Sequence, residues 1–202
     1  MSPRDAVVIG VGNTYRRDDG AGPAVVRALA ATPSALPGHA RLAVCDGEPT
    51  RLIDLWRGAD LAIVVDAVSA DPDAGMLPGN VMRWEWDERV GGLIGDEHGA
   101  EEGAQGTVAG AVTTADDDQD DDEPGLAPAS HSASRPPLVE PAGTHALGPG
   151  AAIDLARALD LLPSRLVVLA VVGDDFGQGP GLSARAAAAV PVAVDRIAAE
   201  MR

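Results

Sequence analysis

Acidic side chains stand where two strongly apolar stretches of the chain end. Asp18 and Asp19 come late in the loop GVGNTYRRDDG (10–20), which follows an apolar run, and Asp66 lies near the end of LAIVVDAV. His145, in the segment THALG, comes just before a predicted helix. Two carboxylates and one imidazole suit a divalent transition metal such as nickel or zinc and leave positions open for water or substrate. These residue types therefore indicate an open metal site.

A plainer interpretation of the same residues stays open at this point. Asp66 could cap the turn that follows it, His145 could simply begin a helix, and Asp18 and Asp19 could be solvated. The metal interpretation rests on the cost of burying a carboxylate that has neither a partner nor a metal.

The glycines of the loop do not form a nucleotide-binding motif. A dinucleotide fingerprint that starts with Gly10 and Gly12 needs a third glycine at position 15, where the chain has Tyr15. The sequence also lacks Gly-Lys-Ser/Thr, and two carboxylates would stand where phosphates bind. We therefore interpret the glycines as letting the chain turn sharply off a strand, so that the loop presents Asp19 to a metal.

The elements that must position these residues follow from the apolar pattern. Helix 50–59 has Thr50 as its expected N-cap, and helix 183–202 has Ser183. The order predicts a three-layer α/β/α domain with a mostly parallel, twisted sheet flanked by helices. Ligands of such sheets gather at the carboxyl ends of the strands. Predicted strands cover 7–12, 40–45, 61–68, 80–88 and 165–173, and predicted helices cover 21–31, 50–59, 151–162 and 183–202.

Composition narrows the class of protein. Cys45 is the one cysteine among 202 residues, so an internal disulfide and a cysteine-rich zinc site are both excluded, and a reducing cytoplasm fits. The start of the chain does not resemble a signal peptide, and no apolar stretch approaches the roughly 20 residues of a membrane helix. A net charge of −16 argues against nucleic acid as a partner.

Most of that charge lies in one segment. The residues 95–141 consist mainly of Gly, Ala, Ser, Pro, Asp and Glu, including DDDQDDDEPG, and have too little apolar surface to offset the entropy of ordering. The sequence therefore predicts one α/β domain built from 1–94 and 142–202, interrupted by a disordered acidic insert. We expect the insert to act as a solubilising spacer.

Five motifs in order resemble one protein family. The segments GVGNTYRRDDGAG, CDGEPTRLIDLWRGAD, LAIVVDAV, THALG and GLS are similar to those of the hydrogenase maturation proteases, the endopeptidases that process the large subunit of [NiFe] hydrogenases. The resemblance covers residues 5–90 and 142–202, and the acidic insert lies outside the family pattern.

The resemblance implies a function and a ligand set. Family members remove a short C-terminal peptide from the large subunit after nickel has been inserted. Carried over by position, the metal-contacting residues are Asp19, Asp66 and His145, with Asp19 one methylene shorter than the glutamate that is frequent in the family. The nickel is supplied by the precursor, which is the implied partner, and a monomer is expected.

The role of Asp46 and the identity of the histidine ligand each have two alternatives. Asp46, in CDGEPT, matches a recurring family aspartate, so it joins Asp19 and Asp66 as an expected catalytic residue; its alternative role is to form a turn with Gly47. His131 competes with His145 for the histidine position, but it lies in the low-complexity tract, and we favour His145.

Three functions remain in view. The first is the nickel-dependent endopeptidase, in which water attacks the peptide bond with help from the metal or from a carboxylate. The second is a non-catalytic, metal-sensing assembly chaperone for the same precursor. The third is an unrelated metallohydrolase, which would have to bind metal tightly by itself. No serine or cysteine nucleophile with a partnered base is evident, and Cys45 is expected in the core.

Overall fold

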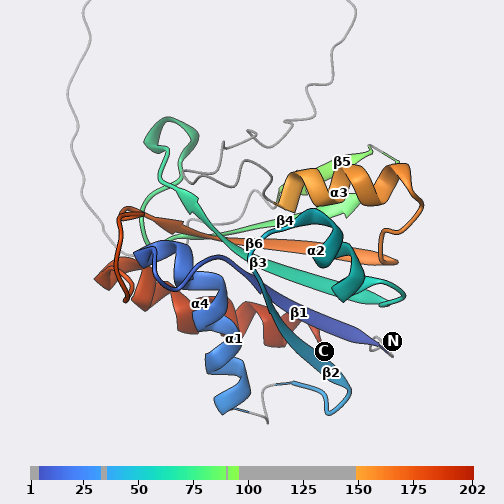
Figure 1. Cartoon of the computed structure of the whole chain (residues 1–202), viewed down its shortest axis with the longest axis horizontal. Coiled ribbons are helices and arrows are strands. Elements are labelled where there is room, and N and C mark those ends of the chain that lie inside the picture. Colours follow the sequence, from blue (N-terminus) through green and yellow to red (C-terminus); the bar gives the residue numbers. More distant parts are fainter. Residues whose placement is uncertain (1–4, 33–35, 90, 96–148) are drawn as a thin grey trace, which may run out of the picture.

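The computed structural model describes residues 5–32, 36–89, 91–95 and 149–202, which form one sheet with helices on both sides (Figure 1). The strands are β1 (Ala6–Val11), β2 (Ala40–Cys45), β3 (Leu61–Ser69), β4 (Val81–Asp87), β5 (Gly92–Gly95) and β6 (Arg165–Gly173). The helices are α1 (Ala21–Ala31), α2 (Pro49–Trp56), α3 (Pro149–Ala158) and α4 (Ala184–Glu200), with short 3₁₀ turns η1 (Arg17–Gly20) and η3 (Pro72–Ala74).

The six strands form a mixed sheet in the order β2-β1-β3-β6-β4-β5. The first four in that order run parallel, and β4 and β5 add an antiparallel hairpin at the β6 edge. Val65 of β3 lies opposite Gly10 of β1, and Asp66 lies opposite Ala170 of β6. The carboxyl ends of β1, β2 and β3 therefore meet at one edge, where the candidate residues are expected.

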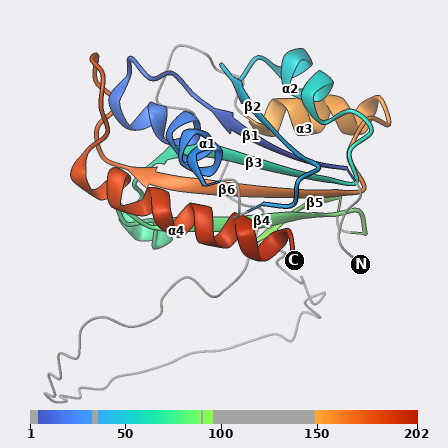
Figure 2. The ribbon, with the colours of Figure 1, turned by 90° about the horizontal axis from the view of Figure 1, so that it is seen from below.

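In the described part of the chain, helices cover both faces of the sheet, so the three-layer prediction is confirmed (Figures 1 and 2). Helices α1 and α4 pack on one face over Val8, Ile63 and Leu169, while α2 and α3 pack on the other over Ile9 and Val64. Because both faces are buried, the central strands are apolar throughout. In the described ranges, no helix combines the length and apolar character that crossing a bilayer requires.

Every predicted strand and helix is present, but some boundaries and caps differ; α2, for example, ends at Trp56, before the predicted end at 59. Strand β5 has no counterpart among the predicted elements, because GLIG is short and rich in glycine. The N-cap of α2 is Glu48 rather than Thr50: the Glu48 carboxylate accepts the N–H groups of Thr50 and Arg51, and Pro49 occupies the first helical position.

Helix α3 ends at Ala158, four residues before the predicted end. Asp160 adopts the left-handed conformation, with φ of 56°, and the N–H of Leu161 donates to the carbonyl of Ala156 at 2.8 Å. This is the hydrogen bond of a Schellman C-cap, with aspartate in the position that glycine usually holds. The Leu161 carbonyl then accepts the indole N–H of the buried Trp56, which ties α3 to α2.

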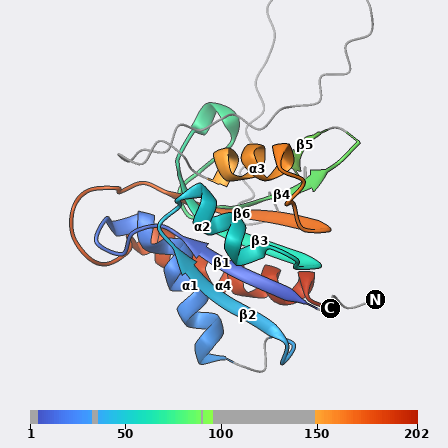
Figure 3. The ribbon, with the colours of Figure 1, turned by 45° about the vertical axis from the view of Figure 1, so that its right-hand side comes forward.

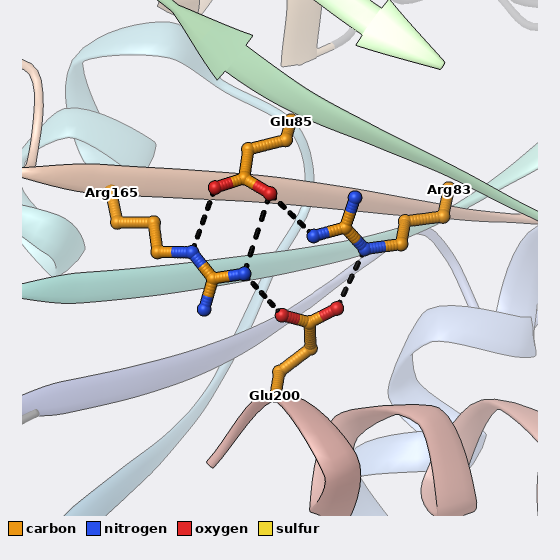
Figure 4. Close-up of polar contacts among 4 residues, drawn as sticks. All are labelled: Arg83, Glu85, Arg165 and Glu200. Atoms are coloured by element: carbon orange, nitrogen blue, oxygen red, sulfur yellow. Dashed lines mark hydrogen bonds and ion pairs between the residues drawn. The ribbon is translucent and has the colours of Figure 1, made fainter. Parts of the chain in front are cut away.

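Four charged side chains fasten α4 to the sheet at the opposite end from the candidate residues (Figure 4). Arg83 of β4 donates to Glu200 of α4 at 2.6 Å, and Arg165 of β6 donates to Glu85 of β4 at 2.7 Å. Arg83 also reaches Glu85, and Arg165 also reaches Glu200, so the four residues form a closed ring. Strand β4, predicted over 80–88, thus turns Arg83 and Glu85 toward α4.

Candidate functional site

The loop after β1 folds back over its own first residue. Gly12 has φ of +131°, and a Cβ atom built on it would lie 1.8 Å from the carbonyl oxygen of Asp19. Its N–H donates to the carbonyl of Cys45 at 3.0 Å. Glycine is therefore required at position 12 both for the turn and for the close passage of residue 19. Gly10, by contrast, lies within β1, where a Cβ would be 2.4 Å from the carbonyl of Gly22, so it lets α1 approach the sheet.

Asp19 is held at the mouth of this loop. Its Oδ2 atom accepts the N–H of Asn13 at 2.9 Å, and the side chain of Asn13 accepts the N–H of Tyr15 at 2.9 Å. The second contact is an Asx turn, which shapes the loop. Asp19 as a whole is partly exposed.

Asp66 lies at the carboxyl end of the neighbouring strand. Its side chain accepts the N–H of Ala67 at 2.9 Å and is partly buried. Burial raises the pKa of Asp66 to about 7, and the negative charge of Asp19 acts in the same direction. The structure therefore brings Asp19 and Asp66 within electrostatic range, as the sequence predicts. A carboxyl with this pKa can exchange a proton near neutral pH, and a cation placed beside the pair would favour its ionised form.

Asp46 lies at the same edge of the sheet, directly after β2, but points to solvent. Its Oδ1 atom accepts the N–H of Glu48 at 3.4 Å, and this contact helps to hold the pKa of Asp46 below its ordinary value. Gly47 beside it has φ of +91°. These are the contacts of the turn-forming role, and the catalytic role of Asp46 stays a prediction.

The imidazole of the expected ligand set lies outside the described residues. His145 and its rival His131 both belong to the range 96–148. Among the described residues, no group of three His, Cys, Asp or Glu side chains is placed to hold a metal. The described part of the site thus consists of the carboxylate pair Asp19 and Asp66.

Asp18 has a different role from its neighbour and is not solvated. Its side chain is fully buried, and its two oxygens accept the N–H groups of Asp174 at 3.0 Å, Asp175 at 3.1 Å and Ser183 at 2.6 Å. Burial opposes ionisation, but the N–H groups outweigh it and hold the pKa of Asp18 below its ordinary value. Its carboxylate is therefore saturated by backbone donors and is not available to a metal.

A glycine makes room for this buried carboxylate. A Cβ built on Gly173, the last residue of β6, would lie 2.7 Å from the Cβ of Asp18. The sequence offers one hint of this division of roles. Side chains of adjacent residues in a tight turn point in different directions, so one aspartate can face inward while the other faces the site.

The segment 174–183 packs along the loop 12–20 after β1, which we call the ligand loop (Figure 3). The N–H of Arg17 donates to the carbonyl of Gly179 at 3.0 Å, and the N–H of Gly179 donates to the carbonyl of Tyr15 at 2.8 Å. The guanidinium of Arg17 also pairs with the carboxylate of Asp175 at 3.2 Å. The segment 174–183 therefore lies beside the candidate site.

Cys45 has the environment expected of a core residue. It is buried, and its sulfur accepts the N–H of Gly47 at 3.4 Å. Burial raises the pKa of its thiol, which opposes formation of the thiolate that a nucleophile would need.

Comparisons with solved structures place this arrangement in a known fold. A hydrogenase maturating endopeptidase, HybD from E. coli, superposes with a TM-score of 0.58 at 18% identity, covering 96% of this chain and 89% of the other. The [NiFe] hydrogenase maturation protease HybD from Thermococcus kodakarensis gives 0.57 at 17% identity, with coverages of 98% and 99%. The chain has the fold of the hydrogenase maturation endopeptidases.

A third solved structure agrees with this assignment. The solution structure of an endopeptidase from Escherichia coli gives a TM-score of 0.62 at 16% identity and covers 98% of this chain and 92% of the other. No family model matches the chain, and no curated protein matches it significantly in sequence. The maturation endopeptidase fold is thus shared at a level where few residues are identical, and the function has to be argued from the site.

Proposed function

We propose that this protein is an endopeptidase that removes the C-terminal peptide from the nickel-loaded large-subunit precursor of a [NiFe] hydrogenase. The observation that carries the proposal is the meeting of Asp19 and Asp66 at the carboxyl edge of a fold shared with hydrogenase maturation endopeptidases. These are the positions that the five sequence motifs assign to metal contact.

The nickel belongs to the substrate, where cysteines of the precursor hold it. Asp19, Asp66 and His145 complete its coordination, so that soft thiolates from the precursor and hard carboxylates from the enzyme share one ion. The pKa of Asp66 gives this docking a physical basis. A divalent cation offsets the repulsion that Asp19 exerts on Asp66, whereas a nickel-free precursor leaves that repulsion in place.

Peptide hydrolysis follows once the precursor is docked. Water attacks the scissile carbonyl, helped either by a carboxylate that takes a proton from the water or by the metal, which would polarise the carbonyl. The C–N bond then breaks, and the proton taken from water passes to the departing amine. Asp46 stands at the same sheet edge; its lowered pKa keeps it ionised at neutral pH but also makes it a weak base, so its catalytic role stays a prediction. We further propose that the protein acts as a monomer in the cytoplasm.

A cleavage assay tests this function. The purified protein is mixed with a cognate precursor in nickel-loaded and nickel-free forms, and the products are identified by mass spectrometry. We expect release of a C-terminal peptide from the nickel-loaded form alone. If neither form is cleaved but the nickel-loaded form still binds, the protein is the non-catalytic chaperone. Cleavage of both forms would disprove the nickel checkpoint.

A further inference from the structure

We propose that Asp18 is the positioning residue of this site. Its carboxylate locks the ligand loop to the segment 174–183 and thereby fixes the direction in which Asp19 presents its own carboxylate. The expected effect on precursor binding rests on the proposed function, but the expected effect on the direction of the Asp19 carboxylate does not. The sequence motifs single out Asp19 for metal contact but assign no role to Asp18.

The contacts of Asp18 join two segments that are distant in sequence. One oxygen accepts two N–H groups at the beginning of segment 174–183, from Asp174 and Asp175, and the other accepts the N–H of Ser183 at its end. The segment therefore closes around one buried carboxylate. Hydrogen bonds to an ionised acceptor are stronger than those between neutral groups, and leaving these donors without a partner in the interior is costly.

The backbone on both sides of Asp18 is fixed as well. Its own N–H donates to the carbonyl of Asp175 at 2.9 Å, and the N–H of Asp19 donates to the carbonyl of Arg16 at 3.1 Å. On the far side, the carbonyl of Asp19 lies against Gly12, with no room for a methyl group. Residue 19 is therefore held between Asp18 and Gly12, and only its side-chain torsions stay free. The contact with the N–H of Asn13 restricts those.

The turn η1 that carries both aspartates includes an unfavourable conformation. Arg17 has φ of +48°, which costs a residue other than glycine roughly 1–3 kcal/mol unless the surroundings hold it in place. The parallel bridge between the preceding residue, Arg16, and Gly179 and the three bonds of Asp18 supply that hold. Without Asp18, we expect the turn to relax and Asp19 to lose its fixed direction.

The first experiment measures the direction of Asp19 without any substrate. Asp18→Asn keeps the size of the side chain but replaces one acceptor oxygen with a donor that faces backbone N–H groups. Amide hydrogen exchange by NMR then follows Asn13, whose N–H reports the Asp19 carboxylate, relative to Ile9 in the central strand. We expect exchange at Asn13 to accelerate at least about tenfold relative to Ile9, because the bond to Asp19 is lost.

Glu200→Gln is the matched control. It removes a charged partner from the ring at the opposite end of the sheet, and it should lower stability without selective exchange at Asn13. Asp19→Asn serves as the reference variant, because it weakens the hydrogen bond from the Asn13 N–H directly and shows how far exchange at Asn13 can accelerate. If Asn13 stays as protected in Asp18→Asn as in Glu200→Gln, the positioning role is disproved.

A second pair of variants keeps the inference testable if Asp18→Asn does not fold. Ser183 has φ of −58°, which proline can adopt, so Ser183→Pro removes the N–H that donates to Asp18. Ser183→Ala keeps that N–H and loses only the hydroxyl that caps α4 through Ala186. Faster amide exchange at Asn13 relative to Ile9 in the proline variant alone supports the positioning role of Asp18. Equal exchange rates at Asn13 in the two variants overturn it.

The second experiment asks whether the positioning reaches the substrate. Binding of the nickel-loaded precursor is measured for Asp18→Asn, Asp19→Asn and the double variant. We expect Asp18→Asn to weaken binding at least about tenfold in the native background and hardly at all once Asp19 is replaced. Equal losses in both backgrounds would disprove action through Asp19. If the native protein does not bind the precursor, the proposed function fails, while the Asn13 measurement still decides the role of Asp18.

Discussion

Asp66 keeps its proton at pH values where an ordinary aspartate has lost it. Burial and the nearby charge of Asp19 raise its pKa from 3.8 to about 7. Between these two values the folded chain binds more protons at this position than the unfolded chain does. The free energy of unfolding therefore decreases as the pH rises through that range, so Asp66 is a source of instability at neutral and higher pH.

Asp66→Asn should for this reason stabilise the protein at high pH. The amide is neutral at all pH values and its oxygen can still accept the N–H of Ala67. We expect the variant to be about 2–4 kcal/mol more stable than the native chain at pH 8 and equally stable near pH 4, as measured by urea unfolding. Asp46→Asn, at an exposed position with a lowered pKa, should show no such gain. A constant difference across the pH range would contradict the assignment.

The expected histidine ligand can be tested against its rival. If His145 is a ligand of the precursor's nickel, as we propose, His145→Ala should reduce processing of the nickel-loaded precursor at least about tenfold. His131→Ala is the matched control and should process at the native rate. Mass spectrometry of the released peptide measures both variants. The reverse result would assign the ligand to His131.

The family motifs single out Asp19 at this edge, but the sequence could not predict the role of Asp18. Asp18 and Asp19 are chemically identical, and both follow the same strand. Their difference depends on segment 174–183, whose three N–H groups saturate Asp18 and leave Asp19 free to face the site. Contacts over such a separation leave no local pattern in the sequence.

At the level of elements, the turn between β1 and η1 depends on the missing side chain of Gly12. Gly12→Ala places a methyl group against the carbonyl of Asp19 as well as straining φ. Gly58→Ala is matched for positive φ but has nothing within 4 Å. We expect the Gly58 variant to lose about 1–2 kcal/mol and the Gly12 variant about 3 kcal/mol or more, together with its processing activity. Chemical unfolding and the cleavage assay measure the two effects, and equal losses of stability would contradict the close passage.

The ring of charged residues around Glu200 should give the protein a pH-dependent anchor for α4. Hydrogen bonds from Arg83 and Arg165 outweigh burial and lower the pKa of Glu200, and Arg165 and Arg83 also lower that of Glu85. Because both folded pKa values lie below the unfolded value, this stabilisation is present above that value and is lost as the pH falls through the lowered pKa.

Glu200→Gln should therefore destabilise the protein by about 1–3 kcal/mol at pH 7 and by much less at low pH. Arg89→Ala breaks an ion pair of the same length whose arginine is 89% exposed, and it should change stability by less than about 1 kcal/mol. Thermal unfolding at both pH values compares the variants. If the two substitutions have equal effects, the ring does not anchor α4.

Helix and strand boundaries show where local patterns mislead. Thr50 is a good N-cap type, but Pro49 already takes the first helical position, so the cap falls to Glu48. Strand β5 exists because β4 offers it a pairing edge, with Trp86 opposite Leu93, and not because GLIG favours a strand by itself. Tertiary context decided both cases.

For the whole molecule, the layered architecture could be predicted because strands covered on both faces are apolar throughout. Val64 and Ile9, for example, lie under α2 and α3, and the neighbouring residues Ile63 and Val8 lie under α1 and α4. Which backbone groups dock segment 174–183 on the loop after β1 could not be predicted, because hydrogen bonds between backbone groups leave little pattern in the sequence.

Removing the acidic segment should change the stability and solubility of the whole molecule. Deleting 96–140 shortens the connection between β5 and α3, and a shorter loop loses less entropy on folding, so the free energy of unfolding should rise by about 1–2 kcal/mol. We expect processing at the native rate and lower solubility, as a solubilising spacer requires. Native solubility with loss of processing would instead show that the segment contributes to the reaction. The cleavage assay and concentration-dependent light scattering measure the two properties.

The bonds of Asp18 also set an order of events during synthesis. Its three partners lie 156, 157 and 165 residues further along the chain, so the ligand loop leaves the ribosome long before the groups that hold it. A nascent chain that has not yet delivered segment 174–183 has β1 and the loop but no lock for the turn. The site consequently takes its final form only when the last strand and the segment after it have emerged, and a partly made chain has no fixed Asp19 with which to capture a metal-bearing precursor.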